Sequence, residues 1–146
     1  MADSNNLKDL PLRPHPALKR LAPLLGTWKN EGVVLSTSKY TMGLGGHYLI
    51  QEFETTTPRG RKLTGIEYIK WDDHTHTFRS YLMADDGSNF TYTYQVDDDG
   101  TCWTWFGDKG SDNFFKGKLI EDGKVLVGRW HSPGGGFDVI SKKVSE

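Results

Sequence analysis

The chain has 146 residues and a formal net charge of −1, from 18 Lys and Arg and 19 Asp and Glu. This length fits one domain with its own core, and the balanced charge argues against a general nucleic-acid or anionic-membrane binder. The single cysteine, Cys102, excludes an internal disulfide. The polar N-terminus and the lack of a long apolar run predict a cytoplasmic protein without a membrane span.

The first elements of the chain are a proline-rich arm and a short helix. Residues 1–14 are predicted to form an N-terminal arm, because their prolines prevent a long helix. Pro16 suits the first position of a helix that runs to about Leu24, where leucines recur on one helical face. Gly26 supplies the stop. Residues 15–146 are assigned to a single domain, and this helix is expected to close one end of it.

From Thr27 onward, short strand-like segments alternate with turns rich in Gly and Asp, in a chain with 17 Gly, five Trp, six Tyr and seven Phe. The predicted strands are 27–37, 47–56, 63–71, 77–84, 89–96, 101–106, 113–121, 124–131 and 137–144. This spacing favours an all-β, antiparallel up-and-down barrel of about 8–10 strands, because an open sheet would expose two long edges. A two-sheet sandwich is the alternative.

Three segments carry a resemblance to known proteins. Gly26-Thr27-Trp28, at the start of the first strand, resembles the Gly-x-Trp signature of the calycin group, which includes lipocalins, fatty-acid-binding proteins and haem-binding nitrobindins. With the segments 45–49 and 130–137, the chain is also similar to small, mostly bacterial lipocalin-like proteins of unassigned function. The resemblance implies that Trp28 packs across the closed end of a barrel, covered by Lys142 or Lys143, and that the barrel holds a ligand cavity.

The sequence offers residues that metal, haem or thiol chemistry could use. Asp72-Asp73-His74-Thr75-His76 offers carboxylate and imidazole ligands, but such residues are ordinary in a solvated hairpin and no second cluster completes a site, so no metal is predicted. Nitrobindin-like proteins bind haem through a late histidine, and His131 is the only late one here. We therefore expect a protein without a cofactor, and haem binding is a second alternative. Cys102 is expected to act as a small apolar residue.

Aromatic residues from neighbouring strands are the main candidates for a ligand site. A barrel of about eight strands can enclose one small molecule, and a cavity lined by aromatic side chains with a few polar groups is the usual small-molecule site. A solidly packed core is the alternative. The aromatic candidates are Tyr48, Tyr68, Tyr81, Tyr92, Tyr94, Trp103 and Trp105.

Six ionisable residues lie in predicted strands, where parity decides which side chains point inward. They are Glu52, Glu54, Glu67, Arg79, Arg129 and His131. Arg79 shares a face with Tyr81 and Met83, and Glu52 shares one with Tyr48, which favours the interior for both. A Glu52–Arg79 pair would be a structural ion pair or the polar end of the site. Four of the six complete the predicted ligand site, namely Glu52, Arg79, Arg129 and His131.

The leading hypothesis is therefore a barrel that binds a small, largely apolar or aromatic molecule in its interior. We expect a monomer or homodimer that engages neither nucleic acid nor membrane. The alternative is an enzyme that steers cyclisation, isomerisation or hydration of a hydrophobic small molecule, with His131 and Glu52 as the catalytic candidates. A purely structural role would leave the aromatic richness unexplained.

Overall fold

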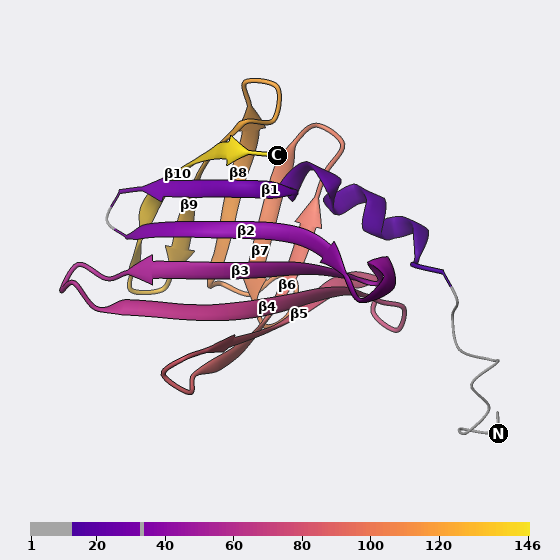
Figure 1. The fold of residues 1–146 in the computed structure, drawn as a ribbon, viewed down its shortest axis with the longest axis horizontal. Helices are drawn as coiled ribbons and strands as arrows, with labels where there is room; N and C mark the ends of the chain where they lie inside the picture. Colours follow the sequence, from indigo (N-terminus) through magenta and orange to yellow (C-terminus); the bar gives the residue numbers. More distant parts are fainter. Residues whose placement is uncertain (1–12, 33) are drawn as a thin grey trace.

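The computed structural model describes residues 13–32 and 34–146. Ten antiparallel strands in this part of the chain follow one another and close into a barrel in which β1 pairs with β10 (Figure 1). The elements are η2 (Pro16–Leu24), β1 (Gly26–Glu31), β2 (Leu35–Gly43), η3 (Leu44–Gly46), β3 (Tyr48–Thr56), β4 (Lys62–Asp72), β5 (Thr77–Ala84), β6 (Asn89–Val96), β7 (Thr101–Phe106), β8 (Phe114–Ile120), β9 (Val125–Ser132) and β10 (Gly135–Ser145). The predicted all-β, up-and-down barrel is confirmed.

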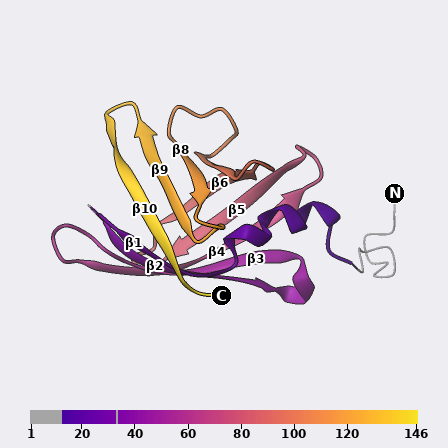
Figure 2. The same cartoon turned by 90° about the horizontal axis from the view of Figure 1, so that it is seen from above.

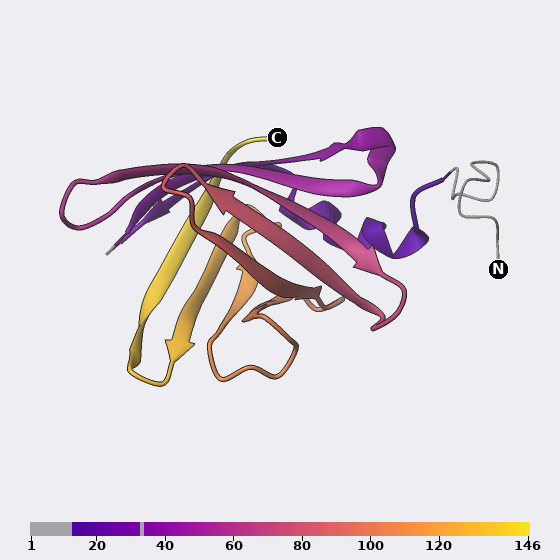
Figure 3. The same ribbon diagram turned by 90° about the horizontal axis from the view of Figure 1, so that it is seen from below.

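Helix η2 packs against one end of the barrel. Strands β1 to β4 form one curved layer (Figure 2), and strands β8 to β10 cross it steeply, while η2 lies at one end of the barrel, where it contacts β3, β4 and β6 (Figure 3). Leu18, Leu21 and Leu24 of the helix are buried in one cluster with Leu49 and Ile69 from the barrel wall. The helix therefore closes this end, as expected. We call the opposite end the mouth.

The sequence explains why η2 is a short 3-10 helix. The His15 side chain accepts a hydrogen bond from the Ala17 amide at 3.1 Å, and Pro16 occupies the first helical position. Pro23 lies inside the helix, where a proline ring would clash with an α-helical carbonyl four residues back. Of the predicted arm at 1–14, all but the last two residues lie outside the described part of the chain. Among the residues described, no helix is long and apolar enough to cross a bilayer.

Trp28 occupies the closed end of the barrel. Its side chain is 4% exposed, and its indole Nε1 donates a hydrogen bond to the Leu24 carbonyl oxygen at 2.9 Å. The Lys143 Nζ lies 5.2 Å from the centroid of the indole ring, a cation–π contact. The positions that the resemblance implies for Trp28 and for a covering lysine are thus confirmed, with Lys143 making the contact.

The predicted strand at 27–37 is wrong, because this segment contributes to two strands. β1 ends at Glu31 and β2 begins at Leu35, and the two pair so that Asn30 lies opposite Ser36. Gly32, in the connection, has a φ of +153°, which L side chains rarely adopt. One extra hairpin thus raises the nine predicted segments to ten strands.

Candidate functional site

A cavity of about 300 Å³ lies inside the barrel. Aromatic rings from β6, β8 and β9 form one of its walls, where Tyr92, Tyr94, Phe115 and Trp130 line the space. The Trp130 ring lies 6.3 Å from the Tyr92 ring and 6.4 Å from the Phe115 ring, measured between centroids. This volume is at the lower end of the range for small-molecule sites. The interior is therefore large enough for one small ligand.

Glu67 is the hub of a buried polar network beside this cavity. Its side chain is fully buried. Its Oε1 accepts hydrogen bonds from Gln51 Nε2 at 2.6 Å and from the Tyr94 hydroxyl at 2.7 Å, while its Oε2 accepts one from the Ser80 hydroxyl at 2.6 Å. Both carboxyl oxygens are thus engaged by side chains from β3, β5 and β6.

Burial controls the proton affinity of this network. Desolvation raises the pKa of Glu67 above its ordinary value, although the hydrogen bonds from Ser80, Tyr94 and Gln51 act in the opposite direction. Burial and the nearby Glu67 carboxyl also raise the pKa of Tyr94 well above its ordinary value. Burial therefore shifts Glu67 towards its protonated form, in which Oε2–H would donate to the Ser80 hydroxyl instead of accepting from it.

Two tyrosine hydroxyls face the cavity without a partner. Tyr40 and Tyr92 both line the cavity, and neither hydroxyl hydrogen-bonds to another residue in the described part of the chain. Burial raises the pKa of Tyr92 to about 12 and the pKa of Tyr40 further, so both hydroxyls keep their protons at neutral pH. Each can therefore donate a hydrogen bond to a guest or to water.

Of the predicted ligand-site residues, only Tyr92 and Tyr94 place their side chains inside the barrel. The inner face of β3 carries Leu49 and Gln51, and the inner face of β4 carries Glu67 and Ile69, so their strand neighbours point outward. The predicted residues on the outer face are Tyr48, Glu52, Tyr68, Arg79, Tyr81, Trp103, Trp105, Arg129 and His131. These nine side chains therefore do not point into the cavity, and the inward orientation favoured for Arg79 and Glu52 is wrong.

Arg79 and Glu52 illustrate the parity error. The face that Arg79 shares with Tyr81 and Met83 is the outer one, where these two residues are 53% and 43% exposed. Arg79 forms its ion pair with Asp108 of the β7–β8 loop, at 2.6 Å, rather than with Glu52. Glu52 is exposed on the outside of β3. The predicted Glu52–Arg79 pair therefore does not form.

Trp103 and Trp105 are stacked on the outside of β7. Their ring centroids lie 5.2 Å apart with an interplanar angle of 7°. Lys116 Nζ lies 4.7 Å from the Trp103 ring and Lys109 Nζ lies 5.8 Å from the Trp105 ring. Trp103 borders the cavity, but its indole donates to Asp97 Oδ2 at 3.1 Å on the outer side. Lys109 of the β7–β8 loop and Lys116 cover these rings on the outside of the barrel, where Trp105 is buried and Trp103 is half-buried.

The two candidates on β9 also lie outside. The His131 ring stacks on Phe114 with centroids 4.8 Å apart. Arg129 is paired with Asp138 of the neighbouring strand at 2.9 Å. His131 is therefore in no position to act on a molecule inside the barrel, and the histidine on which the haem alternative depends does not face the cavity.

Sequence reasoning did not select most residues that line the cavity. These include Tyr40, Gln51 and Trp130. Ser80, which hydrogen-bonds to Glu67 in the polar network, is also absent from the predicted site. One signal does point to Tyr40. If Trp28 is taken as buried, alternation along β1 defines the inner face of that strand, and the pairing of β1 with β2 places Tyr40 on the same face. Glu67 is among the ionisable candidates, but the predicted ligand site takes only Tyr68 from β4.

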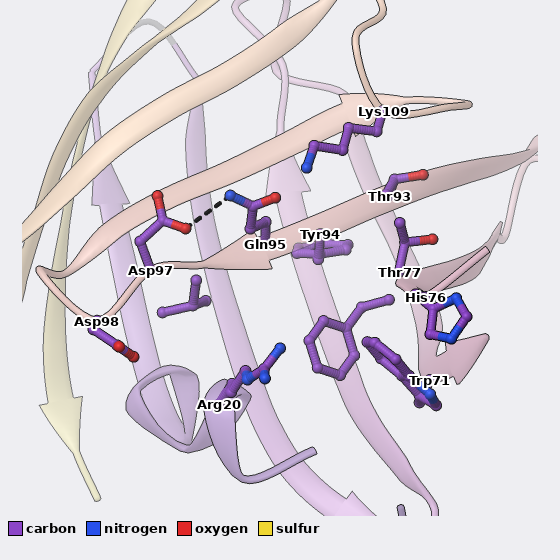
Figure 4. Close-up of a pocket in the computed structure, with 12 residues that line it drawn as sticks. Arg20, Trp71, His76, Thr77, Thr93, Tyr94, Gln95, Asp97, Asp98 and Lys109 are labelled. Carbon is purple, nitrogen blue, oxygen red and sulfur yellow. Dashed lines mark hydrogen bonds between the residues drawn. The ribbon is translucent and has the colours of Figure 1, made fainter. Parts of the chain in front are cut away.

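A second pocket, of about 390 Å³, lies near helix η2 (Figure 4). Arg20, Asp97, Asp98 and Lys109 bring charges of both signs to its edge, and Gln95 Nε2 donates to Asp97 Oδ1 at 2.7 Å. Arg20, Asp98 and Lys109 are exposed to solvent. Solvated charges of opposite sign favour no ligand class, so the barrel cavity is the stronger candidate.

The aspartate and histidine motif at 72–76 forms a hydrogen-bonded turn. Asp72 accepts from the Thr75 hydroxyl at 2.7 Å and from the His74 amide at 3.2 Å, and these bonds lower its pKa. His76 packs edge-on against Trp71. In the described ranges, no group of three or more His, Cys, Asp or Glu side chains is placed to hold a metal ion.

Cys102 lines the cavity, and its thiol is expected to be unreactive in the native protein. Burial raises the pKa of Cys102 to about 12, and the carboxylates of Asp97 and Asp99 add to the effect. Because the thiolate is the reactive form, iodoacetamide at pH 8 should leave native Cys102 unmodified and alkylate it in urea. Intact mass measures this directly, since the chain has one cysteine. Rapid alkylation of the folded protein would contradict this environment.

The fold and the site together define a class: a closed antiparallel β-barrel with an internal cavity between an aromatic wall and a buried polar network. No protein-family model matches the chain, and no curated protein matches it.

Proposed function

We propose that this protein binds a small, largely apolar molecule in the interior of its barrel. One observation carries the proposal: the cavity of about 300 Å³ combines an aromatic wall with the unpartnered hydroxyls of Tyr40 and Tyr92. A few convergent polar groups in an otherwise apolar cavity are the usual composition of a small-molecule site. A core whose only task was stability would gain from filling this space.

The mouth supports the same proposal. Phe90 and Phe106 are 40% and 39% exposed, and their rings lie 5.6 Å apart beside Tyr92. Exposed aromatic side chains that continue an inner wall provide an apolar entrance, whereas a solvated barrel end is expected to carry polar residues there. An apolar guest would thus meet apolar surface from the mouth to the cavity.

Kinship with the calycin group is part of this proposal. It is supported by the closed meander, by Trp28 at the closed end and by the contact of Lys143 with the Trp28 ring. We do not extend the proposal to catalysis, because both catalytic candidates, Glu52 and His131, lie on the outer face. Glu67 borders the cavity, but both of its oxygens are engaged by neighbouring side chains, so it offers a guest no free carboxyl oxygen.

The proposal predicts that filling the cavity abolishes binding. Wild-type protein should bind the neutral fluorescent probe N-phenyl-1-naphthylamine saturably. Thr104 lines the cavity, so Thr104→Phe should weaken binding at least about 10-fold by occupying the space of the guest. The measurement is a fluorescence titration, with urea unfolding of each variant as a check on folding.

The matched control is Thr37→Phe, which adds the same ring to the exposed outer face of β2. Its affinity for the probe should equal that of the wild type. A wild-type protein without saturable binding, or equal affinity in Thr104→Phe, would refute binding in the interior.

A further inference from the structure

The cavity has two unlike walls. Across the barrel from Tyr92 and Tyr94, four small polar side chains lie on the inner faces of β1, β2 and β10: Asn30, Ser36, Ser38 and Ser141. Asn30 is directly opposite Ser36 on one side and Ser141 on the other, while Ser38 pairs with Trp28. We call these four residues the polar strip. In the ring of ten strands, β1 and β6 lie diametrically across the barrel, so the polar strip faces Tyr92 and Tyr94.

The polar strip has unused hydrogen-bonding capacity. None of its four side chains hydrogen-bonds to another residue in the described ranges, whereas every fully enclosed side-chain nitrogen or oxygen there has a partner. The polar atoms of the strip must therefore face open cavity space. Hydroxyl and amide groups placed in this way satisfy themselves with water or with a guest. Three adjacent strands thus present a continuous hydrogen-bonding edge.

The cavity offers no charge to a guest. Its lining contains no Lys, Arg or His, and Glu67 is its one carboxyl group. Both Glu67 oxygens are already engaged, and burial raises its pKa. An anionic or cationic guest would lose its hydration here without gaining a counter-charge, which is strongly unfavourable. A carboxylate such as a fatty-acid anion does not fit this interior.

We infer that the ligand is an uncharged aromatic molecule that carries hydroxyl, carbonyl or amide groups along one edge. Its ring packs against Tyr92, Phe115 and Trp130, and its polar edge hydrogen-bonds to the polar strip. This inference rests on the proposed function and names the ligand class of the same site. The width of the polar strip, from Ser36 on β2 to Ser141 on β10, matches a guest with polar groups at more than one edge position.

Four compounds with one ring system test the inference by displacement of N-phenyl-1-naphthylamine. These are naphthalene, 2-naphthol, 2-naphthoate and 2-naphthylmethylammonium. 2-Naphthol should bind about 3- to 10-fold more tightly than naphthalene, the effect of one net hydrogen bond. The two ions should bind at least about 10-fold more weakly than 2-naphthol. Equal or tighter binding of either ion would overturn the inference.

A combined Asn30→Ala, Ser36→Ala and Ser141→Ala variant locates the preference. It should bind naphthalene within about twofold of the wild type but lose its preference for 2-naphthol. Thr37→Ala, on the outer face of β2, is the control and should keep the preference for 2-naphthol. If the combined variant keeps the preference for 2-naphthol, that preference arises from other residues, and the role of the polar strip is overturned.

If naphthalene and 2-naphthol bind to the wild type with equal affinity, the inference fails and interior binding stands. If neither compound nor the probe binds, the proposed function fails as well.

Discussion

Replacement of Trp28 by alanine is expected to lower the free energy of unfolding by about 3–5 kcal/mol, the range for truncating a buried large aromatic residue. The change removes the ring under Lys143 and the hydrogen bond to the Leu24 carbonyl, and it leaves a void beneath η2. The midpoint of urea unfolding, with an unchanged slope, measures the loss.

Tyr81→Ala is a suitable control for Trp28→Ala. This residue is also aromatic, but it is 53% exposed on the outer face of β5, so its truncation should cost no more than about 1 kcal/mol. Because Trp28 does not line the cavity, a folded Trp28→Ala protein should keep the ligand preference of the wild type. A Trp28→Ala protein of wild-type stability would refute the assignment of Trp28 to the closed end.

Removal of the Glu67 side chain is expected to have a similarly large effect. Glu67→Ala leaves Gln51, Ser80 and Tyr94 without their buried partner. Each lost bond to a buried polar group costs about 1–3 kcal/mol, so the loss of all three should lower the free energy of unfolding by at least about 3 kcal/mol. Glu67→Gln should retain most of the stability, because its amide oxygen accepts from two donors and its amide nitrogen donates to the Ser80 hydroxyl.

The same pair of proteins tests the protonation state of Glu67. Its pKa is raised in the folded state above the ordinary value of 4.5, so the folded protein binds the proton more tightly than the unfolded chain. This contribution to stability is complete below pH 4.5 and is lost as pH rises through the folded pKa. The free energy of unfolding of the wild type, relative to Glu67→Gln, should fall with a slope of up to about 1.4 kcal/mol per pH unit in that window.

Urea unfolding at successive pH values measures this difference. Parallel pH profiles for the wild type and Glu67→Gln would show that the carboxyl has the same pKa in the folded and unfolded chains. That result would contradict the uncharged polar network beside the cavity. If the free energy of unfolding of the wild type relative to Glu67→Gln instead rises with pH, Glu67 is a carboxylate that its three hydrogen-bond donors stabilise.

Local signals in the sequence were enough for the order and type of the elements. Pro16 and Gly26 mark the bounds of the helical segment, and Asp85-Asp86-Gly87 marks a hairpin in which Gly87 has a φ of +86°. The strict alternation of β6 assigned Tyr92 and Tyr94 to the same face, which is the inner one. These features depend on residues close in sequence, so the sequence by itself determined the helix, the succession of strands after the β1–β2 hairpin and these two cavity residues.

The tertiary structure decided which face of most other strands lines the cavity. Glu67 is inside because Gln51, Ser80 and Tyr94, which lie 16, 13 and 27 residues away in sequence, bring hydrogen bonds to its carboxyl group. Trp105 is buried outside because the loop after β7 covers it. The cost of burying a polar side chain, or of exposing an aromatic one, depends on partners that strand pairing supplies. Those partners lie on other strands and not in the local sequence. The closed barrel is therefore needed to tell which face of most strands is the inner one.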